Sequence, residues 1–452
     1  MTERVSRAAA VAVLVTTSLS ALLVFGSAAA LGVAVPSMTT DLAGGRSTAS
    51  WMVLAFLLAN SATILVFGKL SDSLGRRPLY LGGLAVFTAG SVVCASATHD
   101  GVLIAARVAQ GLAAAAAVSN TTAVLGDVFP PPRLPLALSL NITAGGSATL
   151  LGPLVGGLLV DAFGWRSIFV CTVPLGVLAL AIGWWSLRYA HAPGRAPGFR
   201  LDVPGAVLSV AGIGAVLLAG QLLADGRWSA AGVGLAVGLV ALAAFVMVER
   251  RVREPILDLR LLGGDRGYAY GSSFCAGLAF GASVLLVVLY LQTVRGMSAG
   301  VAGALALPMG LALVVASPVT GMLARRISAR ALTTAGALGV GCSMVGLAGV
   351  LGAAPGVVGI SLLLLLTGFG EGMFMASITR RVIDGVAPDR RAIANGFRSV
   401  LHNGALALST ALVLAVVLGA PGGVAGYVAT AATLGVIGLV AALLAARRVR
   451  IG

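Results

Sequence analysis

Charged and catalytic side chains are scarce in this chain of 452 residues. Only 10% of the residues are charged, a single lysine (Lys69) is present, and there are three histidines and four cysteines. None of the histidines has a metal-binding neighbour, the cysteines lack CxxC spacing, and no Walker loop occurs. We therefore expect a protein that is not an enzyme, is not driven by ATP, and holds no metal, disulfide or other cofactor.

Apolar residues are abundant instead. They make up 58% of the chain, and the mean hydropathy is +1.02. A soluble domain of this length does not reach such values, so the composition predicts an all-α protein that crosses a membrane many times. The first apolar run follows Arg4 and Arg7 and ends near Val35. It is too long for the apolar core of a signal peptide, and we expect an uncleaved first helix.

Fourteen apolar stretches have about the 20 residues that cross roughly 30 Å of hydrocarbon. They are residues 9–36, 50–67, 79–97, 101–125, 137–160, 167–187, 203–224, 230–249, 268–291, 301–324, 331–352, 356–378, 393–418 and 424–446. An even number of spans places both ends of the chain on the same side of the membrane.

The basic residues test this count. Of the 30 basic residues, 25 lie in one set of loops, four (Arg46, Arg166, Arg227 and Arg295) lie in the other, and Arg107 lies inside a span. Because cytoplasmic loops are enriched in basic residues, both termini are predicted to be cytoplasmic. The near absence of lysine is typical of a GC-rich genome, and we expect a multi-pass protein of a bacterial cytoplasmic membrane.

The loop between the second and third stretches carries a patterned group of charges. Residues 68–77 read Gly68-Lys69-Leu70-Ser71-Asp72-Ser73-Leu74-Gly75-Arg76-Arg77. This segment resembles the signature Gly-x-Leu-x-Asp-x-x-Gly-Arg-Arg/Lys of the major facilitator superfamily of transporters, and a charged cytoplasmic loop is the simpler alternative. Residues 321–327 echo the segment after a later span, with Arg325 in the place of the aspartate.

Further segments extend the resemblance to nearly the whole chain. Leu103, Arg107, Gln110 and Gly111 resemble the superfamily's second motif. The fifth stretch carries an antiporter-like motif, for which ordinary glycine packing is the alternative, formed by Gly145, Gly152, Pro153, Gly156 and Gly157. Together with residues 165–169, 173–176 and 254–261, these motifs resemble the fourteen-helix drug:proton antiporter family.

The resemblance implies a major facilitator fold, in which two six-helix bundles flank two extra helices. The bundles are expected at residues 1–200 and 263–452, with the extra helices and a cytoplasmic linker at 201–262. That family often carries an acidic residue nine positions before a proline in its first helix. Here the proline is Pro36 and the residue is Ser27, which puts coupling through a first-helix carboxylate in doubt.

Glu371 is the one acidic residue of fifteen that we place deep inside a span. Ionisable groups in hydrocarbon are costly and usually mark a transport pathway. Because burial favours the neutral form of a carboxyl, Glu371 could take up a proton on one side and release it on the other, and it could attract cationic substrates. The alternative is a carboxylate that pairs with a neighbouring helix for structural reasons.

Arg107 and Asp72 are the other charged candidates. The family resemblance implies that Arg107 takes part in proton transfer or arranges the polar core, whereas partners among backbone carbonyls would make it structural. Asp72 is expected at a cytoplasmic helix end, where it would act as a gate. It could latch onto the N-terminal amides of another helix, onto Arg133 or onto Arg398.

Sparse polar residues on the apolar helices, together with Phe374, are candidates for lining a substrate cavity. They are Asn60, Gln110, Asn120, Asn141, Gln292, Phe374, His402 and Asn403. An interhelical hydrogen bond is the alternative role of each polar one. Asn395, Arg398 and His402 are predicted to share one helical face. A broad apolar cavity with few fixed donors suits lipophilic ligands.

These observations predict a proton-coupled secondary transporter that exports small lipophilic or amphipathic molecules, such as drugs, antibiotics or secondary metabolites, by alternating access. Its partners would be the small-molecule substrate, protons and membrane lipid, without nucleic acid, and the chain is expected to be a monomer. Two alternatives remain open. The protein could export or import one specific metabolite, or it could be a membrane sensor or scaffold that does not transport.

Overall fold

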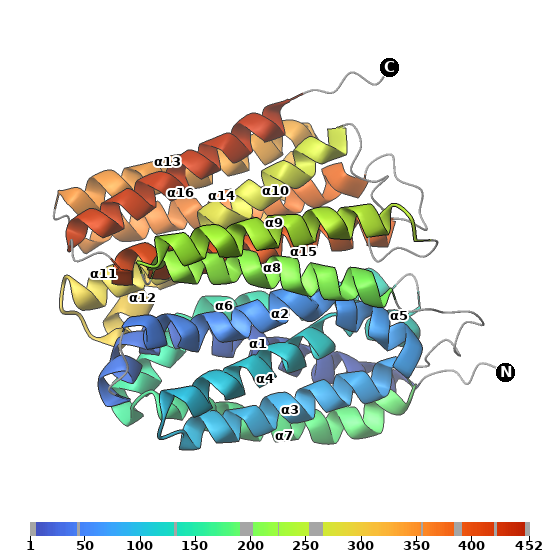
Figure 1. The fold of residues 1–452 in the computed structure, drawn as a ribbon. Helices are drawn as coiled ribbons and strands as arrows, with labels where there is room; N and C mark the ends of the chain where they lie inside the picture. The colour runs from blue at the N-terminus through green and yellow to red at the C-terminus, as the bar shows by residue number, and fades with distance from the viewer. Residues whose placement is uncertain are drawn as a thin grey trace. The chain divides into compact units, whose positions relative to one another are not determined.

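The computed structural model describes residues 6–42, 46–130, 133–189, 202–224, 226–252, 265–353, 356–383, 391–419 and 423–447. All regular secondary structure in these ranges is helical (Figure 1). Contacts divide the chain into two compact units, Met1–Val210 and Ala211–Gly452. Each unit is described by itself.

The helices follow the apolar stretches along the chain. Unit 1 contains α1 (Arg7–Asp41), α2 (Arg46–Leu74), α3 (Arg76–Ser96), α4 (Asp100–Val118), α5 (Thr121–Val128), α6 (Leu134–Phe163), α7 (Arg166–Ser186) and the short 3₁₀ helix η1 (Leu187–Tyr189). The boundary between the units falls within α8 (Val203–Ala224). Unit 2 continues with α9 (Trp228–Glu249), α10 (Asp265–Gly281), α11 (Ser283–Thr293), α12 (Ala299–Leu323), α13 (Ala329–Gly352), α14 (Val357–Ile383), α15 (Arg391–Gly419) and α16 (Val424–Ala446).

Twelve helical segments among the described residues are long and apolar enough to cross a membrane. Helices α2 and α8 coincide with two further predicted stretches, but their described apolar parts, Trp51–Ile64 and Pro204–Gly220, are shorter. The all-α membrane architecture is confirmed, and the count of fourteen spans stays a prediction. Large aliphatic side chains such as Val86, Leu362 and Leu443 are exposed, as expected where helices face lipid rather than water.

The same helix pairings occur in both units. In unit 1, α1 packs on α6 and α7, α3 packs on α4 and α7, and α2 packs on α4. In unit 2, α10 packs on α15 and α16, α13 packs on α14 and α16, and α12 packs on α14. The order of helices is the same in each set, so α4 of unit 1 corresponds to α14 of unit 2. The domain boundaries at 200 and 262 stay predictions.

The turn at the signature motif is shorter than the sequence suggested. We expected a loop over residues 68–77, but α2 continues to Leu74 and α3 begins at Arg76. Gly75 alone separates them, with φ at 93°. Only glycine adopts this region readily because a Cβ would clash with the backbone. The charged residues therefore sit on helix ends instead of a flexible loop.

Two of the predicted spans are interrupted. The stretch expected at 101–125 forms α4 and α5, with Ser119 and Asn120 between them. The stretch expected at 268–291 forms α10 and α11, separated by Ala282. The backbone N–H of Ala282 donates to Ser409 Oγ on α15 at 3.2 Å. That bond satisfies a buried donor at the break and ties it to the neighbouring helix.

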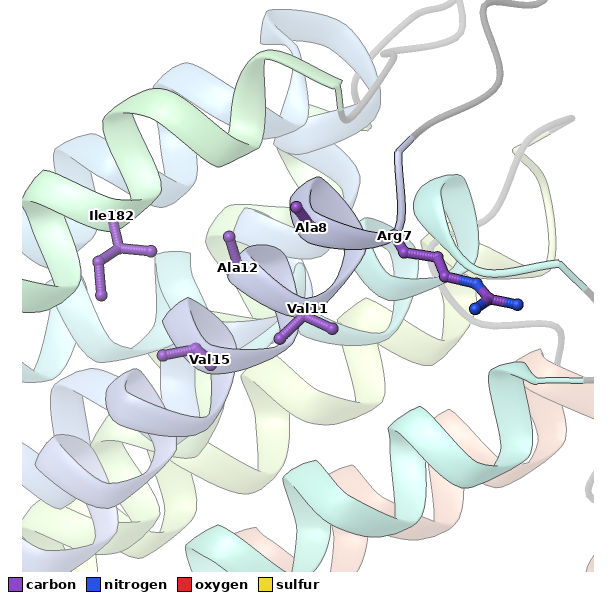
Figure 2. Close-up of a pocket in the computed structure, with 6 residues that line it drawn as sticks. All are labelled: Arg7, Ala8, Val11, Ala12, Val15 and Ile182. Atoms are coloured by element: carbon purple, nitrogen blue, oxygen red, sulfur yellow. The ribbon is translucent and has the colours of Figure 1, made fainter.

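The outer surface of unit 1 is hollowed beside the start of α1. Figure 2 shows the residues that line this depression, which are Arg7, Ala8, Val11, Ala12 and Val15 of α1 and Ile182 of α7; the guanidinium of Arg7 points away from the others. Apart from Arg7 its lining is aliphatic, and it contains none of the predicted site residues. We interpret it as a lipid-facing surface and not as a substrate site.

Candidate functional site

Glu371 lies at the middle of α14, the fifteenth of its 27 residues. Its side chain is buried, with 1% of its surface exposed. Gly368 and Gly372 press α14 against α12, since a Cβ on either would lie within 2.6 Å of the Met309 or Leu313 carbonyl oxygen. On the other side, a Cβ on Gly370 would lie 2.8 Å from the Gly336 oxygen on α13. The glycines near Glu371 thus bring two helices close to it.

The Glu371 carboxyl has one polar contact among the described residues, the ring of His402 on α15. Nε2 of His402 lies 3.4 Å from Oε1 of Glu371. The other ring nitrogen, Nδ1, lies 3.2 Å from the backbone oxygen of Ser273 on α10. The histidine therefore bridges a carboxyl on α14 and a carbonyl on α10. All three residues belong to unit 2.

Arg398 supplies positive charge to this site. It lies one turn before His402 on α15, as the shared face predicted, and only 8% of its surface is exposed. Its guanidinium donates to Ser399 Oγ at 3.0 Å and contacts Met375 Sδ at 3.5 Å, while attracting the Glu371 carboxyl electrostatically. In a buried site such an attraction is weakly screened. Arg398 therefore interacts favourably with the ionised form of the Glu371 carboxyl.

Two glycines bring α10 close enough to position His402. Gly277 and Gly281 form a Gly-x-x-x-Gly motif on α10, the spacing that lets two membrane helices touch. A Cβ on Gly277 would lie 2.8 Å from the His402 oxygen and 3.0 Å from its Nδ1. A Cβ on Gly281 would lie 2.7 Å from Cα of Leu406 on the same helix, α15. The ring orientation thus depends on residues with no side chain.

Arg107 occupies a separate polar cluster in unit 1. Its Nη1 donates to Oε1 of Gln110 at 2.9 Å, its Nε donates to the Met52 oxygen at 3.3 Å, and its guanidinium lies over the Phe56 ring at 4.3 Å. Gln110 in turn donates to Ser91 Oγ at 2.9 Å. The Met52 oxygen is a backbone carbonyl, as the structural alternative expected, whereas Gln110 and Phe56 contribute neutral side chains. Whether Arg107 also moves protons stays a prediction.

Glycines bring α4 against α2 and α3 near this arginine. A Cβ on Gly111 would lie 2.4 Å from the Phe56 oxygen on α2. A Cβ on Gly83 of α3 would lie 2.7 Å from the Ala113 oxygen. Gly111, the glycine of the second motif, therefore allows close packing of α4 on α2. Gln110 lies at the contact of α4 with α3, since a Cβ on Gly90 would lie 2.7 Å from Cγ of Gln110.

The signature motif is anchored through its arginines. Arg76 forms an ion pair with Asp127 on α5, and the two side chains are 15% and 17% exposed. Arg77 donates to the Trp184 oxygen at 3.0 Å and lies over the same indole ring at 5.5 Å. These contacts connect the start of α3 to α5 and α7. The Asp72 side chain lies outside the described residues, so its latch stays a prediction.

Comparison with known proteins agrees with this organisation. A family model described as Major Facilitator Superfamily matches residues 17–410. The chain belongs to this superfamily. It is a membrane transport protein and not an enzyme. The fold is similar to that of a peptide transporter of the POT family, with a TM-score of 0.72, 16% identity, and coverage of 97% of this chain and 93% of the other.

Two curated relatives of this major facilitator protein are more similar in sequence. It is 32% identical over 393 residues to the multidrug resistance protein Stp of Mycobacterium tuberculosis, covering 85% of this chain and 72% of the relative. It is 34% identical over 406 residues to the cephamycin export protein CmcT of Amycolatopsis lactamdurans, covering 85% and 80%.

The antiporter-like motif of this transporter joins α6 to α1. A Cβ on Gly156 would lie 2.6 Å from the Cβ of Ala30, and a Cβ on Gly152 would lie 2.7 Å from that of Ala29. Gly145 lies against the Phe25 ring. Pro153 and Gly157 also lie within α6. A groove of about 280 Å³ runs beside this contact and is bordered by Ser27, whose buried hydroxyl has no hydrogen-bond partner among the described residues.

The remaining cavity candidates are placed at different depths. Gln110, Asn120 and Phe374 are fully buried, and Asn141 is 8% exposed. Asn60 and Gln292 are half-buried, and Asn403 is exposed. The structure brings together Arg107 with Gln110, and Glu371 with His402, but it assigns no substrate contact to any of these residues. Their role in substrate binding stays a prediction, and the Asn395 side chain lies outside the described residues.

Several residues of these sites were not predicted from the sequence. Ser273 acts through its backbone oxygen, which any residue would supply. Gly277 and Gly281 could have been found from their four-residue spacing. Asp127 could have been found as an acidic residue just after the predicted stretch that contains Arg107. Its pairing with Arg76 depends on the fold.

Proposed function

We propose that this chain is a proton-driven exporter of small lipophilic or amphipathic molecules and that it works by alternating access. The observation that carries the proposal is the Glu371 carboxyl, buried at the middle of a spanning helix beside His402. An isolated charge there is costly, so the carboxyl is stable when protonated and reactive toward a proton or a cation when it is not. Two relatives, a multidrug resistance protein and a cephamycin export protein, support export as the direction.

In the proposed cycle, Glu371 takes a proton from the outer side and releases it to the cytoplasm. The deprotonated carboxyl is stabilised by Arg398 and is available to attract a cationic substrate. The proton and the cationic substrate require opposite protonation states of Glu371, so the two cannot bind at the same time. Inward flow of protons therefore drives outward flow of substrate. No first-helix carboxylate is available at Ser27, which concentrates coupling on Glu371.

The signature motif is proposed to control when the cytoplasmic side opens. Asp72 is proposed to latch the cytoplasmic side closed, and the Arg76–Asp127 pair would hold the end of α3 so that the latch lies at a fixed place. Arg107 would keep α2, α3 and α4 together as one rigid group through Met52 and Gln110. Alternating access in related folds depends on such rigid bundles.

A narrower substrate range is the second candidate. The similarity to a cephamycin export protein favours export of one secondary metabolite over a broad range of drugs. A panel of dyes and antibiotics separates the two, because a broad exporter lowers the accumulation of several chemically unrelated compounds, whereas a specific exporter acts on one class.

Efflux from cells tests the proposal. The full chain is expressed in a strain deleted for its own efflux pumps, and accumulation of ethidium and of a panel of antibiotics is measured with and without a proton-gradient uncoupler. We expect efflux that the uncoupler stops and that Glu371→Gln abolishes. Glu249→Gln is a matched control, since Glu249 is also buried, with 3% exposed, but ends α9.

Protein levels are compared by fluorescence of a fused tag. Efflux that persists with the uncoupler would contradict proton drive. Efflux in Glu371→Gln at the wild-type rate would contradict the coupling role of the carboxyl. No difference from empty vector across the whole panel would favour the sensor or scaffold alternative.

A further inference from the structure

The contacts of His402 point to a second member of the proton site. We propose that Glu371 and His402 hold a single proton between them, and that the Ser273 carbonyl fixes which ring nitrogen faces the carboxyl. The inference rests on the proposed role of Glu371, and it makes a pair of residues from two helices, rather than one residue, the carrier of the proton.

The contacts of His402 determine which of its ring nitrogens carries the N–H group. A neutral imidazole has one N–H group and one nitrogen lone pair. A backbone oxygen can only accept a hydrogen bond, and the Ser273 oxygen lies 3.2 Å from Nδ1. The N–H group is therefore on Nδ1, as is common where one ring nitrogen meets a carbonyl. This leaves the lone pair on Nε2, the nitrogen that faces Glu371.

Nε2 of His402 and Oε1 of Glu371 lie 3.4 Å apart. A carboxylate is also an acceptor, so without a proton the two atoms would face each other as two lone pairs in a buried site. With one proton, either the carboxyl donates to Nε2 or the imidazolium donates to the carboxylate. Both arrangements place a donor between Oε1 and Nε2, whereas Oε2 has no hydrogen-bond partner among the described residues in either case. The site therefore favours one shared proton.

The surroundings add one charge to this pair. Arg398 on α15 acts electrostatically on both Glu371 and His402. Tyr270 on α10 interacts in the same way with Arg398, and Cys275 borders the apolar cluster on that helix. From α12 and α13, the groups that meet the glycines around Glu371 are backbone atoms and aliphatic side chains. Arg398 is thus the charge that compensates the pair once its proton has left.

The consequence is that His402 joins α14 and α10 most firmly when the proton is present. After loss of the proton, the single N–H of the neutral ring cannot serve both the Glu371 carboxylate and the Ser273 oxygen. His402 would therefore lose one of its two contacts, either the one with α14 or the one with α10. The protons of such a pair come off in steps that belong to the pair and not to one residue.

Nitrogen NMR of the full chain in lipid nanodiscs tests the inference without any substrate. The chain has three histidines, so ¹⁵N-histidine labelling gives few signals, and His402→Gln identifies the pair from His402. In the wild-type protein near neutral pH we expect Nδ1 to be protonated and Nε2 to be a hydrogen-bonded partner of Glu371. A neutral ring protonated on Nε2 would overturn the inference.

A pH titration of the same signals gives the second readout. The midpoint for His402 is expected to differ by about one to three pH units between the wild type and Glu371→Gln, since a charged neighbour at this distance has that effect. The ¹⁵N signals of His99, which is exposed at the start of α4, should be the same in both proteins. A His402 midpoint that is also unchanged would show that no proton is shared.

The outcome is separable from that of the proposed function. If Glu371→Gln abolishes efflux but leaves the His402 midpoint and tautomer unaltered, Glu371 carries the proton alone and the shared pair is wrong. If the variant moves the midpoint while efflux continues, the pair exists but is not the coupling site. His402→Gln should slow uncoupler-sensitive efflux at least tenfold, and His99→Gln, its matched control, should not.

Discussion

The contact between α10 and α15 offers a test of the site through a residue that has no side chain. Replacing Gly277 by alanine places a Cβ 2.8 Å from the His402 oxygen. Ordinary contacts begin near 3.4 Å, so the two helices must separate locally by about 0.6 Å. The Nδ1–oxygen distance between His402 and Ser273, now 3.2 Å, would then grow to about 3.8 Å, beyond hydrogen-bond range.

The expected loss of stability is small compared with the loss of function. Overpacking costs about 1–3 kcal/mol, and a lost hydrogen bond costs about 0.5–1.5 kcal/mol. Alanine returns about 1 kcal/mol of helix propensity relative to glycine. The variant should therefore fold, with a net loss of about 1–3 kcal/mol, while His402 gains freedom to adopt either tautomer.

Two measurements check this prediction. The ¹⁵N spectrum of Gly277→Ala should show His402 in a mixture of tautomers, and uncoupler-sensitive efflux should fall several-fold at equal protein level. Gly271→Ala is the matched control, because it makes the same change in α10 where a Cβ would meet only Leu444 Cδ1 at 3.5 Å. Wild-type tautomer and efflux in Gly277→Ala would refute the idea that this contact sets the ring.

Two other variants test the contacts of unit 1. Arg107→Met should lower the free energy of unfolding by about 2–4 kcal/mol, since the Met52 oxygen and Gln110 Oε1 would each lose a buried donor. A melting temperature equal to that of the wild type would contradict a structural role for Arg107. Asp127→Asn should cost about 1–3 kcal/mol and reduce efflux, because the partly buried pair with Arg76 is lost. The more exposed pair of Asp41 and Arg166 is its control, and Asp41→Asn should change stability by less than about 1 kcal/mol.

The sequence predicted the features that follow from local chemistry. Hydropathy located the helices because each must bury or face lipid along its whole length, and the same reasoning found Glu371 as an ionisable group inside a span. Helical periodicity placed Arg398 and His402 on one face. The signature motif and its relatives in later spans predicted the superfamily, which comparison with known proteins confirmed.

The sequence did not reveal contacts that depend on which helices become neighbours. Glu371 and His402 are 31 positions apart on different helices, and no local pattern links them. The turn at Gly75 was expected to be longer, because charges suggested a solvated loop, whereas they lie on helix ends that hold Arg76 beside Asp127. The break at Ala282 depends on a hydroxyl supplied by Ser409, far along the chain.

The repeated helix pairings allow the two units to be compared position by position. Gly111 presses α4 onto α2, and Gly368 presses α14 onto α12 in the same way. In that register Glu371 corresponds to Ala114, and Arg107 corresponds to Leu364. The two units are copies of one plan, yet the charge of each stands where the other has an aliphatic residue.

This mismatch sets a limit on engineering. At these corresponding positions the buried carboxyl of Glu371 occurs only in unit 2, and the buried guanidinium of Arg107 occurs only in unit 1. A chain assembled from two copies of unit 1 would keep the packing but lose every residue of the Glu371 site. One assembled from two copies of unit 2 would lose the cluster that Arg107 organises. By this reasoning, neither unit can replace the other in the chain.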